Sequence, residues 1–317
     1  MLQMFGGMGT MTAVLYAPLP NRTLIGLRGE DAWRFLQALV TQDLKLLSPE
    51  RALYALLLSP QGRFMFDFFI LQAKTGLWLD VHKDDKSSLL LTLKRYCLRQ
   101  TVSFDDMEGT YRLFGVFGDA ALDALKLLSQ RGHCLWGQST SSFVDPRLAE
   151  LGGRVIVKSG EPFRLPGAIP GSLSDYRAHQ IALGVPDHNA LEREKSIPLE
   201  YGLHTLGAIA QDKGCYVGQE LIARTLHRGQ VRKHVFSAKV QGTTPYHGDL
   251  VYTDQGERVG RVVDVFEDKA LILGYIMPLT SVCQSQSLVE VRRGVDRVCM
   301  LRPRKPSWMN SGLLDSD

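Results

Sequence analysis

The apolar residues of the chain follow helical and strand periods in turn, and this predicts a mixed α+β protein. Residues 29–40 place apolar side chains at the i, i+3, i+4, i+7 spacing of an amphipathic helix. Two apolar runs follow, at 53–58 and 63–71. The turn between them, 59–62, has proline second and glycine fourth, as a β-turn favours. We therefore expect a helix followed by a β-hairpin.

Helical and strand periods continue to alternate to about residue 232, and after this point the pattern of apolar residues changes. We predict further helices at 86–99, 120–130 and 175–183, and further strands at 77–81, 111–117 and 154–157. From residue 233 onward, short alternating strands are divided by glycines and polar turns, which is typical of a small antiparallel barrel or sandwich. The predicted units are an α+β unit at 1–105, a second at 106–232, a barrel at 233–302, and a tail at 303–317 that we expect to be disordered.

An acidic residue interrupts the second strand of the predicted hairpin. Asp67 lies among four phenylalanines, at positions 64, 66, 68 and 69. Strand alternation can turn its carboxylate to solvent, as most aspartates prefer. Burial would instead raise the pKa of Asp67 or require a hydrogen-bonded partner. The pattern leaves both alternatives open.

The segment Lys213–Glu220 reads Lys-Gly-Cys-Tyr-Val-Gly-Gln-Glu and has the layout of a reactive cysteine. Its two glycines permit a sharp turn, and an amphipathic run, 221–228, predicts a helix directly after it. The helix N-terminus and the Lys213 ammonium both favour a thiolate at Cys215. The alternative is a small buried side chain in a tight turn, as free cysteines often are.

Basic residues follow the cysteine. Glu220, Arg224 and Arg228 are spaced four apart, so a helix aligns them on one face. They can form a weak ladder of ion pairs. They can also bind a carboxylate or phosphate, which arginine holds with a bidentate fork.

These residues resemble the signature of the YgfZ family of folate-binding proteins, which are relatives of the aminomethyltransferase (T protein) of the glycine cleavage system. The similarity covers about residues 24–275, in the family's order. It includes the octet at 213–220, Phe35-Leu36-Gln37, Thr41-Gln42-Asp43, Leu58 to Arg63, Arg95-Tyr96, Leu98-Arg99, Gly184-Val185-Pro186 and Ile197-Pro198 with Glu200.

The resemblance implies a three-domain ring of the aminomethyltransferase type, with tetrahydrofolate bound near its centre. It also implies a role in assembly or repair of iron–sulfur clusters, with effects on cluster-dependent enzymes that include tRNA-modifying ones. The catalytic positions it implies are Cys215, Lys213 and Tyr216. The folate contacts it implies are Asp67, Arg99, Glu200, Gln219, Glu220, Arg224 and Arg228.

The chain departs from its transferase relative at one place. Where that enzyme has two adjacent aspartates after its glycine turn, this sequence has Phe66-Asp67. Folate-dependent aminomethyl or one-carbon transfer is therefore the alternative function, and no reaction is assigned.

Composition narrows the remaining possibilities. With 317 residues and 44% hydrophobic content, the chain can form several cores. Five cysteines lie far apart with no C-x-x-C pair, which argues against a disulfide framework and fits a cytoplasmic protein. If the protein contacts iron or a cluster, Cys215 would be one ligand among others, some of them from a partner protein. We predict no resident metal.

Charge and hydropathy bear on partners. A net charge of +4 is weak evidence for nucleic acid, so direct tRNA contact is only a secondary expectation. Residues 1–12 do not have the pattern of a secretory signal, and no apolar run approaches the 18 or so residues of a membrane span.

Overall fold

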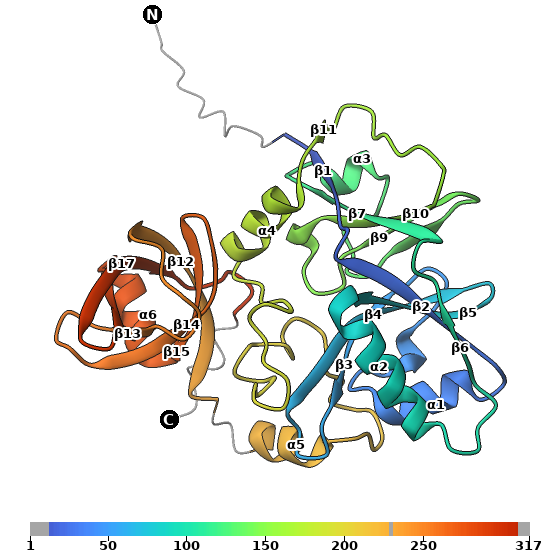
Figure 1. Cartoon of the computed structure of the whole chain (residues 1–317), viewed down its shortest axis with the longest axis horizontal. Coiled ribbons are helices and arrows are strands. Elements are labelled where there is room, and N and C mark those ends of the chain that lie inside the picture. Colours follow the sequence, from blue (N-terminus) through green and yellow to red (C-terminus); the bar gives the residue numbers. More distant parts are fainter. Residues whose placement is uncertain (1–12, 228–230, 310–317) are drawn as a thin grey trace, which may run out of the picture.

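The computed structural model describes residues 13–227 and 231–309, which form two α+β units and a barrel (Figure 1). The first unit has an antiparallel sheet in the order β3-β4-β5-β2-β6. Its strands are β2 (Arg22–Arg28), β3 (Leu53–Leu58), β4 (Phe64–Ala73), β5 (Gly76–His82) and β6 (Ser103–Asp106). Helices α1 (Ala32–Leu39) and α2 (Lys83–Tyr96) bury their apolar faces against it, and η1 (Leu44–Leu46) is a 3-10 turn.

The second unit has a six-stranded sheet in the order β11-β1-β7-β10-β9-β8. Its strands are β1 (Leu15–Pro18), β7 (Tyr111–Phe117), β8 (Cys134–Trp136), β9 (Thr140–Val144), β10 (Gly153–Lys158) and β11 (Ile169–Pro170). Helix α3 (Ala121–Ala124) and the 3-10 turn η2 (Ala149–Leu151) belong to it, and helix α4 (Leu173–Ala182) lies between this sheet and the barrel. Strand β1 pairs here although it precedes the first sheet in sequence, and its pairing with β11 is parallel.

The third unit is a closed barrel in the order β12-β15-β14-β13-β16-β17. Its elements are β12 (Lys233–Gly242), β13 (Leu250–Tyr252), β14 (Arg258–Phe266), β15 (Lys269–Tyr275), α6 (Ile276–Gln284), β16 (Val289–Arg293) and β17 (Asp296–Arg304). The α+β fold class with antiparallel sheets and a C-terminal barrel is thus confirmed. The sequence pattern did not reveal helix α6 or the last strand, β17.

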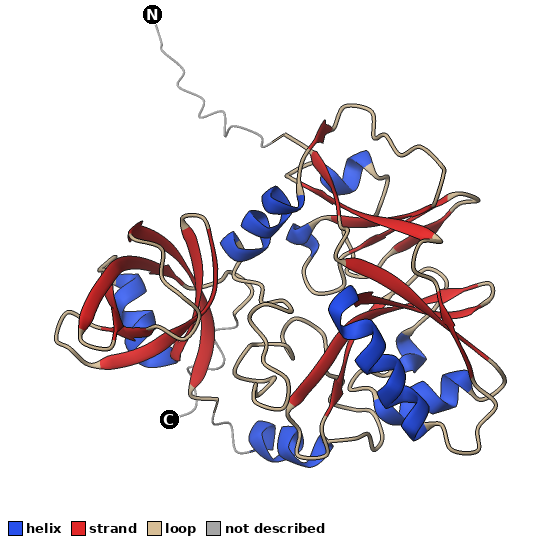
Figure 2. Cartoon of the chain, viewed as in Figure 1, coloured by secondary structure: helices blue, strands red, loops and turns tan. Residues whose placement is uncertain are grey.

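A long irregular segment joins these units. Between α4 and α5 (Gln219–His227) the chain has no helix or strand, and Figure 2 shows its loops between the barrel and the first sheet. Hydrogen bonds hold the segment to the first unit, because Thr41 Oγ1 donates to the Ala208 carbonyl at 2.6 Å and the Phe64 amide donates to the Ser196 carbonyl at 3.0 Å. This segment carries the predicted reactive cysteine.

The structure corrects two predicted helices. The helix expected at 120–130 ends at Ala124, because Lys126 adopts a left-handed backbone with φ of 58°. Helix α2 begins at Lys83, where the His82 side chain rather than an aspartate accepts the capping hydrogen bond from Asp84. No helix in the described ranges is long and apolar enough to cross a membrane.

The tail also differs from expectation over its first part. Strand β17 runs to Arg304, and the buried Trp308 donates its indole N–H to the Leu183 carbonyl at 2.9 Å. Residues 303–309 are therefore docked rather than disordered, since a tryptophan with a satisfied N–H is a strong apolar anchor. Residues 310–317 lie outside the described part of the chain.

Candidate functional site

The loop that carries Cys215 is fixed to helix α1 by a buried lysine. Lys213 Nζ donates to the carbonyls of Gln37, Val40 and Gln42, at 2.7, 2.6 and 3.0 Å. These carbonyls lie at the C-terminal end of α1, where a cation is favourable. Burial lowers the pKa of Lys213 to about 8, against the opposing charge of Asp43. The three N–H donors of the Lys213 ammonium are therefore used on carbonyls of residues 37, 40 and 42, and not on the thiol.

Two glycines fix the other end of this loop. Gly218 has φ of +80°, and a Cβ there would meet the Ser59 carbonyl oxygen at 2.4 Å. Gly62 has φ of +75°, and a Cβ there would lie 2.7 Å from the Leu221 side chain and 2.9 Å from the Gly218 carbonyl oxygen. The hairpin turn between β3 and β4 therefore touches the cysteine loop directly, and both contacts require glycine.

Between these two anchors the thiol faces solvent. Cys215 is exposed, and a Cβ on the neighbouring Gly214 would meet no atom within 4 Å. Cys134 and Cys299 are buried, and burial raises the pKa of their thiols to about 12 and about 11. All five cysteines lie in the described ranges, and Cys215 is the only one of them that is exposed. Helix α5 begins shortly after Cys215 in the sequence, at Gln219.

A pocket of about 290 Å³ lies along α5, and Tyr216, which follows Cys215 in sequence, is part of its lining. Its lining is mainly apolar and comes from α5 and the preceding segment: Ile209, Ala210, Gln211, Tyr216, Gln219, Ile222, Ala223 and Leu226. Tyr216 is buried, and this raises the pKa of its phenol to about 12. Tyr216 therefore stays a neutral wall of the pocket at physiological pH.

A second site lies at the centre of the molecule, where the two sheets meet. Asp145 accepts two hydrogen bonds from the Arg147 guanidinium, at 3.0 and 2.8 Å, and one from Arg154 at 3.2 Å. Arg154 also reaches Asp80 at 3.1 Å, and Asp80 accepts from Arg22 at 2.7 Å. Burial opposes ionisation of Asp145, but the two guanidinium groups hold its pKa at about 2. The charges are therefore paired despite their burial.

Asp67 faces this network from β4. It is 5% exposed, so the buried alternative is correct, and Tyr54 donates its phenol to one carboxylate oxygen at 3.1 Å. Burial raises the pKa of Asp67, with Arg22 and Arg147 opposing. The other carboxylate oxygen, Oδ1, is buried and has no hydrogen-bond partner. A buried acceptor of this kind is costly unless a ligand or water supplies a donor.

Three further unpartnered atoms line the same central cavity. They are Asn21 Oδ1, Tyr176 Oη and Arg177 Nε, and each is buried. Together with Asp67 they offer two acceptors and two donors, which is a set suited to a polar heterocycle such as a pterin. The cavity itself measures only about 30 Å³, room for about one water. The polar groups fit a folate ring, but side chains must move to admit it.

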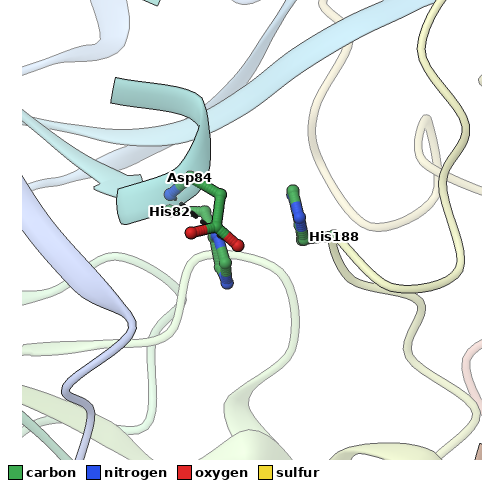
Figure 3. Close-up of side chains that lie close together, drawn as sticks. All are labelled: His82, Asp84 and His188. Atoms are coloured by element: carbon green, nitrogen blue, oxygen red, sulfur yellow. Dashed lines mark hydrogen bonds and ion pairs between the residues drawn. The ribbon is translucent and has the colours of Figure 1, made fainter. Parts of the chain in front are cut away.

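A pair of stacked histidines borders this cavity (Figure 3). The rings of His82 and His188 are 3.9 Å apart with planes at 5°, and Asp84 lies near His82. Asp85 accepts a hydrogen bond from His188 at 3.0 Å and pairs with Arg193. In parallel stacked rings the nitrogen lone pairs run side by side and do not converge. The group His82, Asp84 and His188 is therefore not a preformed metal centre, although these three side chains lie close together.

The structure separates the predicted residues into two places. Asp67 lines the central cavity, whereas no residue of the cysteine loop, 211–218, does so. Of the remaining predicted folate contacts, Arg99, Glu220 and Arg224 are exposed, Glu200 is half-buried, and Gln219 lines the pocket that Tyr216 also lines. Asp67 is thus the one predicted folate contact among the described residues that lines the central cavity. Arg228 lies outside the described residues.

Most residues of the central site were not predicted from the sequence. Arg22, Arg147, Arg154, Tyr176 and His188 come from different elements, and none forms a local motif. One signal was available, because Asp80 and Arg154 interrupt otherwise apolar strands. A charged residue inside a buried strand requires a partner.

Residues 21–154 match the family described as the GCVT N-terminal domain. The human mitochondrial iron–sulfur cluster assembly factor IBA57 is 32% identical over 265 residues, 77% of this chain and 72% of that protein. Its mitochondrial homologue from Coccidioides immitis is 33% identical over 245 residues, covering 71% of this chain and 56% of that protein. These names contradict the expectation of a cytoplasmic protein, since the relatives are mitochondrial factors.

A solved structure shows the same fold. The glycine cleavage system aminomethyltransferase T from Bartonella henselae superposes with a TM-score of 0.71, covering 94% of this chain and 87% of that one. The identity is 14%, so the similarity concerns the fold alone. The aminomethyltransferase-like arrangement expected from the sequence is confirmed.

Proposed function

Because the chain belongs to the family of iron–sulfur cluster assembly factors represented by human IBA57, we propose that it assists the assembly or repair of iron–sulfur clusters. The observation that carries this proposal is the exposed thiol of Cys215 on a loop held at both ends. Such a loop presents one sulfur in a fixed position, which is what a contact with a metal centre on another protein requires.

The thiol works together with a partner in this proposal. Iron–sulfur clusters are generally held by four ligands, mostly thiolates. Cys134 and Cys299 are buried, and Cys97 and Cys283 are partly buried, in other elements. Cys215 would supply one ligand, and the client or assembly protein would supply the others. In this proposal such a protein would also contact the pocket that Tyr216 lines.

We further propose that the central cavity binds tetrahydrofolate, as expected from the resemblance to the YgfZ family. Asp67 Oδ1 would accept an N–H of the pterin ring, and Tyr176 and Arg177 would donate to its carbonyl or ring nitrogens. Folate, when bound, carries a one-carbon unit. The unpartnered atoms support this assignment, and equilibrium binding of a reduced folate to the wild type and to Asp67→Ala tests it.

The first experiment compares Cys215→Ala with Cys97→Ala in cells that lack their own copy of the protein. We expect cluster-dependent enzymes to lose activity with Cys215→Ala and to keep it with Cys97→Ala, while a cluster-independent enzyme stays unchanged in both. Equal activity in the two variants would remove Cys215 from the proposal.

The alternative function, one-carbon transfer, predicts turnover of tetrahydrofolate with an aminomethyl donor. Turnover that survives Cys215→Ala but stops in Asp67→Asn would favour it over the leading proposal. Direct tRNA contact predicts binding that weakens steeply with salt and when the exposed Arg224 and Arg232 are neutralised. Without such binding, effects on tRNA modification are indirect, through cluster-dependent enzymes.

A further inference from the structure

Two stacked histidines, His82 and His188, are among the residues that line the central cavity. The His188 side chain is 29% exposed, whereas the residues Arg147 and Tyr176 deeper in the cavity are each 2% exposed. We propose that His82 and His188 form a gate, and that the cavity opens when His188 leaves the stack. This inference rests on the proposed function only for the ligand that the gate would admit, a reduced folate.

The size of the cavity requires such an opening. Its volume of about 30 Å³ holds about one water, whereas ligand pockets usually measure hundreds of cubic ångströms. Four unpartnered buried atoms nevertheless face it, from Asn21, Asp67, Tyr176 and Arg177. The interior is thus equipped for a larger polar partner than the closed state can hold.

The two histidines differ in how firmly they are held. His82 ends β5 and caps α2, and its second ring nitrogen lies 3.4 Å from the Asn21 amide. His188 belongs to the irregular segment after α4, and its one described side-chain hydrogen bond is to Asp85, at 3.0 Å. Movement of His188 therefore breaks one hydrogen bond and one ring contact, while movement of His82 would uncap a helix.

The charges make this gate sensitive to pH. The hydrogen bond to Asp85 raises the pKa of His188, while burial and the charge on His188 lower the pKa of His82 to about 4. Of the two stacked rings, His188 is therefore the one that takes up a proton first as pH falls, and His82 stays neutral. Asp85 is shared with Arg193, and the carboxylates of Asp67 and Asp187 also favour the charged form of His188.

The direction of the pH effect on opening follows from the raised pKa of His188. The charged bond between His188 and Asp85 is complete below the ordinary histidine pKa of 6.5, and it weakens as pH rises through the raised value. The cavity should thus open more readily at higher pH. A charge-assisted hydrogen bond contributes about 1.5 kcal/mol, which corresponds to about tenfold in the opening equilibrium.

The test measures association of 5-formyltetrahydrofolate between pH 6 and 8.5 by stopped-flow fluorescence. In the wild type we expect the association rate to rise about tenfold with pH. In His188→Ala it should be fast throughout and independent of pH. The control is His179→Ala, which lies outside the cavity and bonds the Glu150 carbonyl, and it should keep the wild-type profile.

A second measurement needs no ligand. Hydrogen exchange at residues 187–193, corrected for the intrinsic pH effect, should be faster in His188→Ala and in Asp85→Asn than in the wild type. If exchange is the same in all three proteins, the gate is refuted. If exchange responds but no variant binds the folate at any pH, the gate stands and the folate proposal fails.

Discussion

Asp145→Asn tests the buried charge network at the centre of the molecule. The substitution keeps the shape of the side chain and removes its charge. Asp145 is fully buried. Its carboxylate forms an ion pair with Arg147 at 2.8 Å and a second ion pair with Arg154. In the variant, the Arg147 guanidinium, itself 2% exposed, is left without its counter-charge.

The magnitude follows from the pKa of Asp145. The guanidinium groups hold this pKa at about 2, compared with 3.8 for a free aspartate. That difference corresponds to about 2.4 kcal/mol of folding free energy at neutral pH. Breaking a buried ion pair and leaving one charge alone typically costs about 3–5 kcal/mol. We therefore expect Asp145→Asn to lower the free energy of unfolding by about 2–5 kcal/mol at pH 7.

The pH dependence gives a sharper test. Because the folded pKa is depressed, the stabilisation is present above pH 3.8 and is lost as pH falls through about 2. About two thirds of the 2.4 kcal/mol should have disappeared at pH 2.5. Urea unfolding followed by circular dichroism at pH 7, 4 and 2.5 measures the difference between wild type and variant.

A matched control separates this effect from general acid sensitivity. Asp268 is an exposed turn carboxylate that pairs with Lys269, and Asp268→Asn should leave stability unchanged because exposed ion pairs contribute little. A difference below about 1 kcal/mol for Asp145→Asn at pH 7, or a difference that does not shrink in acid, would refute the account of the network.

Three further substitutions test the loop and the docked tail. Gly218→Ala should cost about 1–3 kcal/mol, because its Cβ meets a carbonyl oxygen at 2.4 Å and its φ is +80°, while Gly214→Ala should not, and urea unfolding compares them. Lys213→Met should leave the carbonyls of Gln37, Val40 and Gln42 without this donor and speed hydrogen exchange over residues 211–218; unchanged exchange would contradict this role. Trp308→Ala should lower the free energy of unfolding by about 3–5 kcal/mol, and a loss under 1 kcal/mol would show that the tail is not an anchor.

Local patterns predicted the elements whose signals lie within a few residues. The helical spacing at 29–40 and the Ser59–Gly62 turn identified α1 and the β3–β4 hairpin. Alternation after residue 233 identified the barrel strands β12 to β16 but not β17. These predictions were correct because periodicity and turn chemistry are local properties of the sequence. The helix predicted at 120–130 was wrong beyond Ala124, because Lys126 adopts a left-handed backbone conformation that no local pattern indicated.

The octet at 213–220 was identified from sequence as the most informative segment, but the role of its lysine was decided by tertiary structure. Lys213 was expected to favour the thiolate, and its ammonium instead binds carbonyls of residues 37, 40 and 42, some 170 positions away. Such a contact cannot be inferred from spacing, because the loop must first be packed on α1.

The sequence by itself determined the fold class, the lone thiol and the family resemblance, since these depend on residue types in order along the chain. The tertiary structure alone decided that Asp67 is buried, that Arg147 and Arg154 neutralise Asp145, and that the thiol and the central cavity are separate sites. The physical reason is that burial and charge pairing join residues from both sheets and the irregular segment, and the cost of a buried charge is set only once those partners meet.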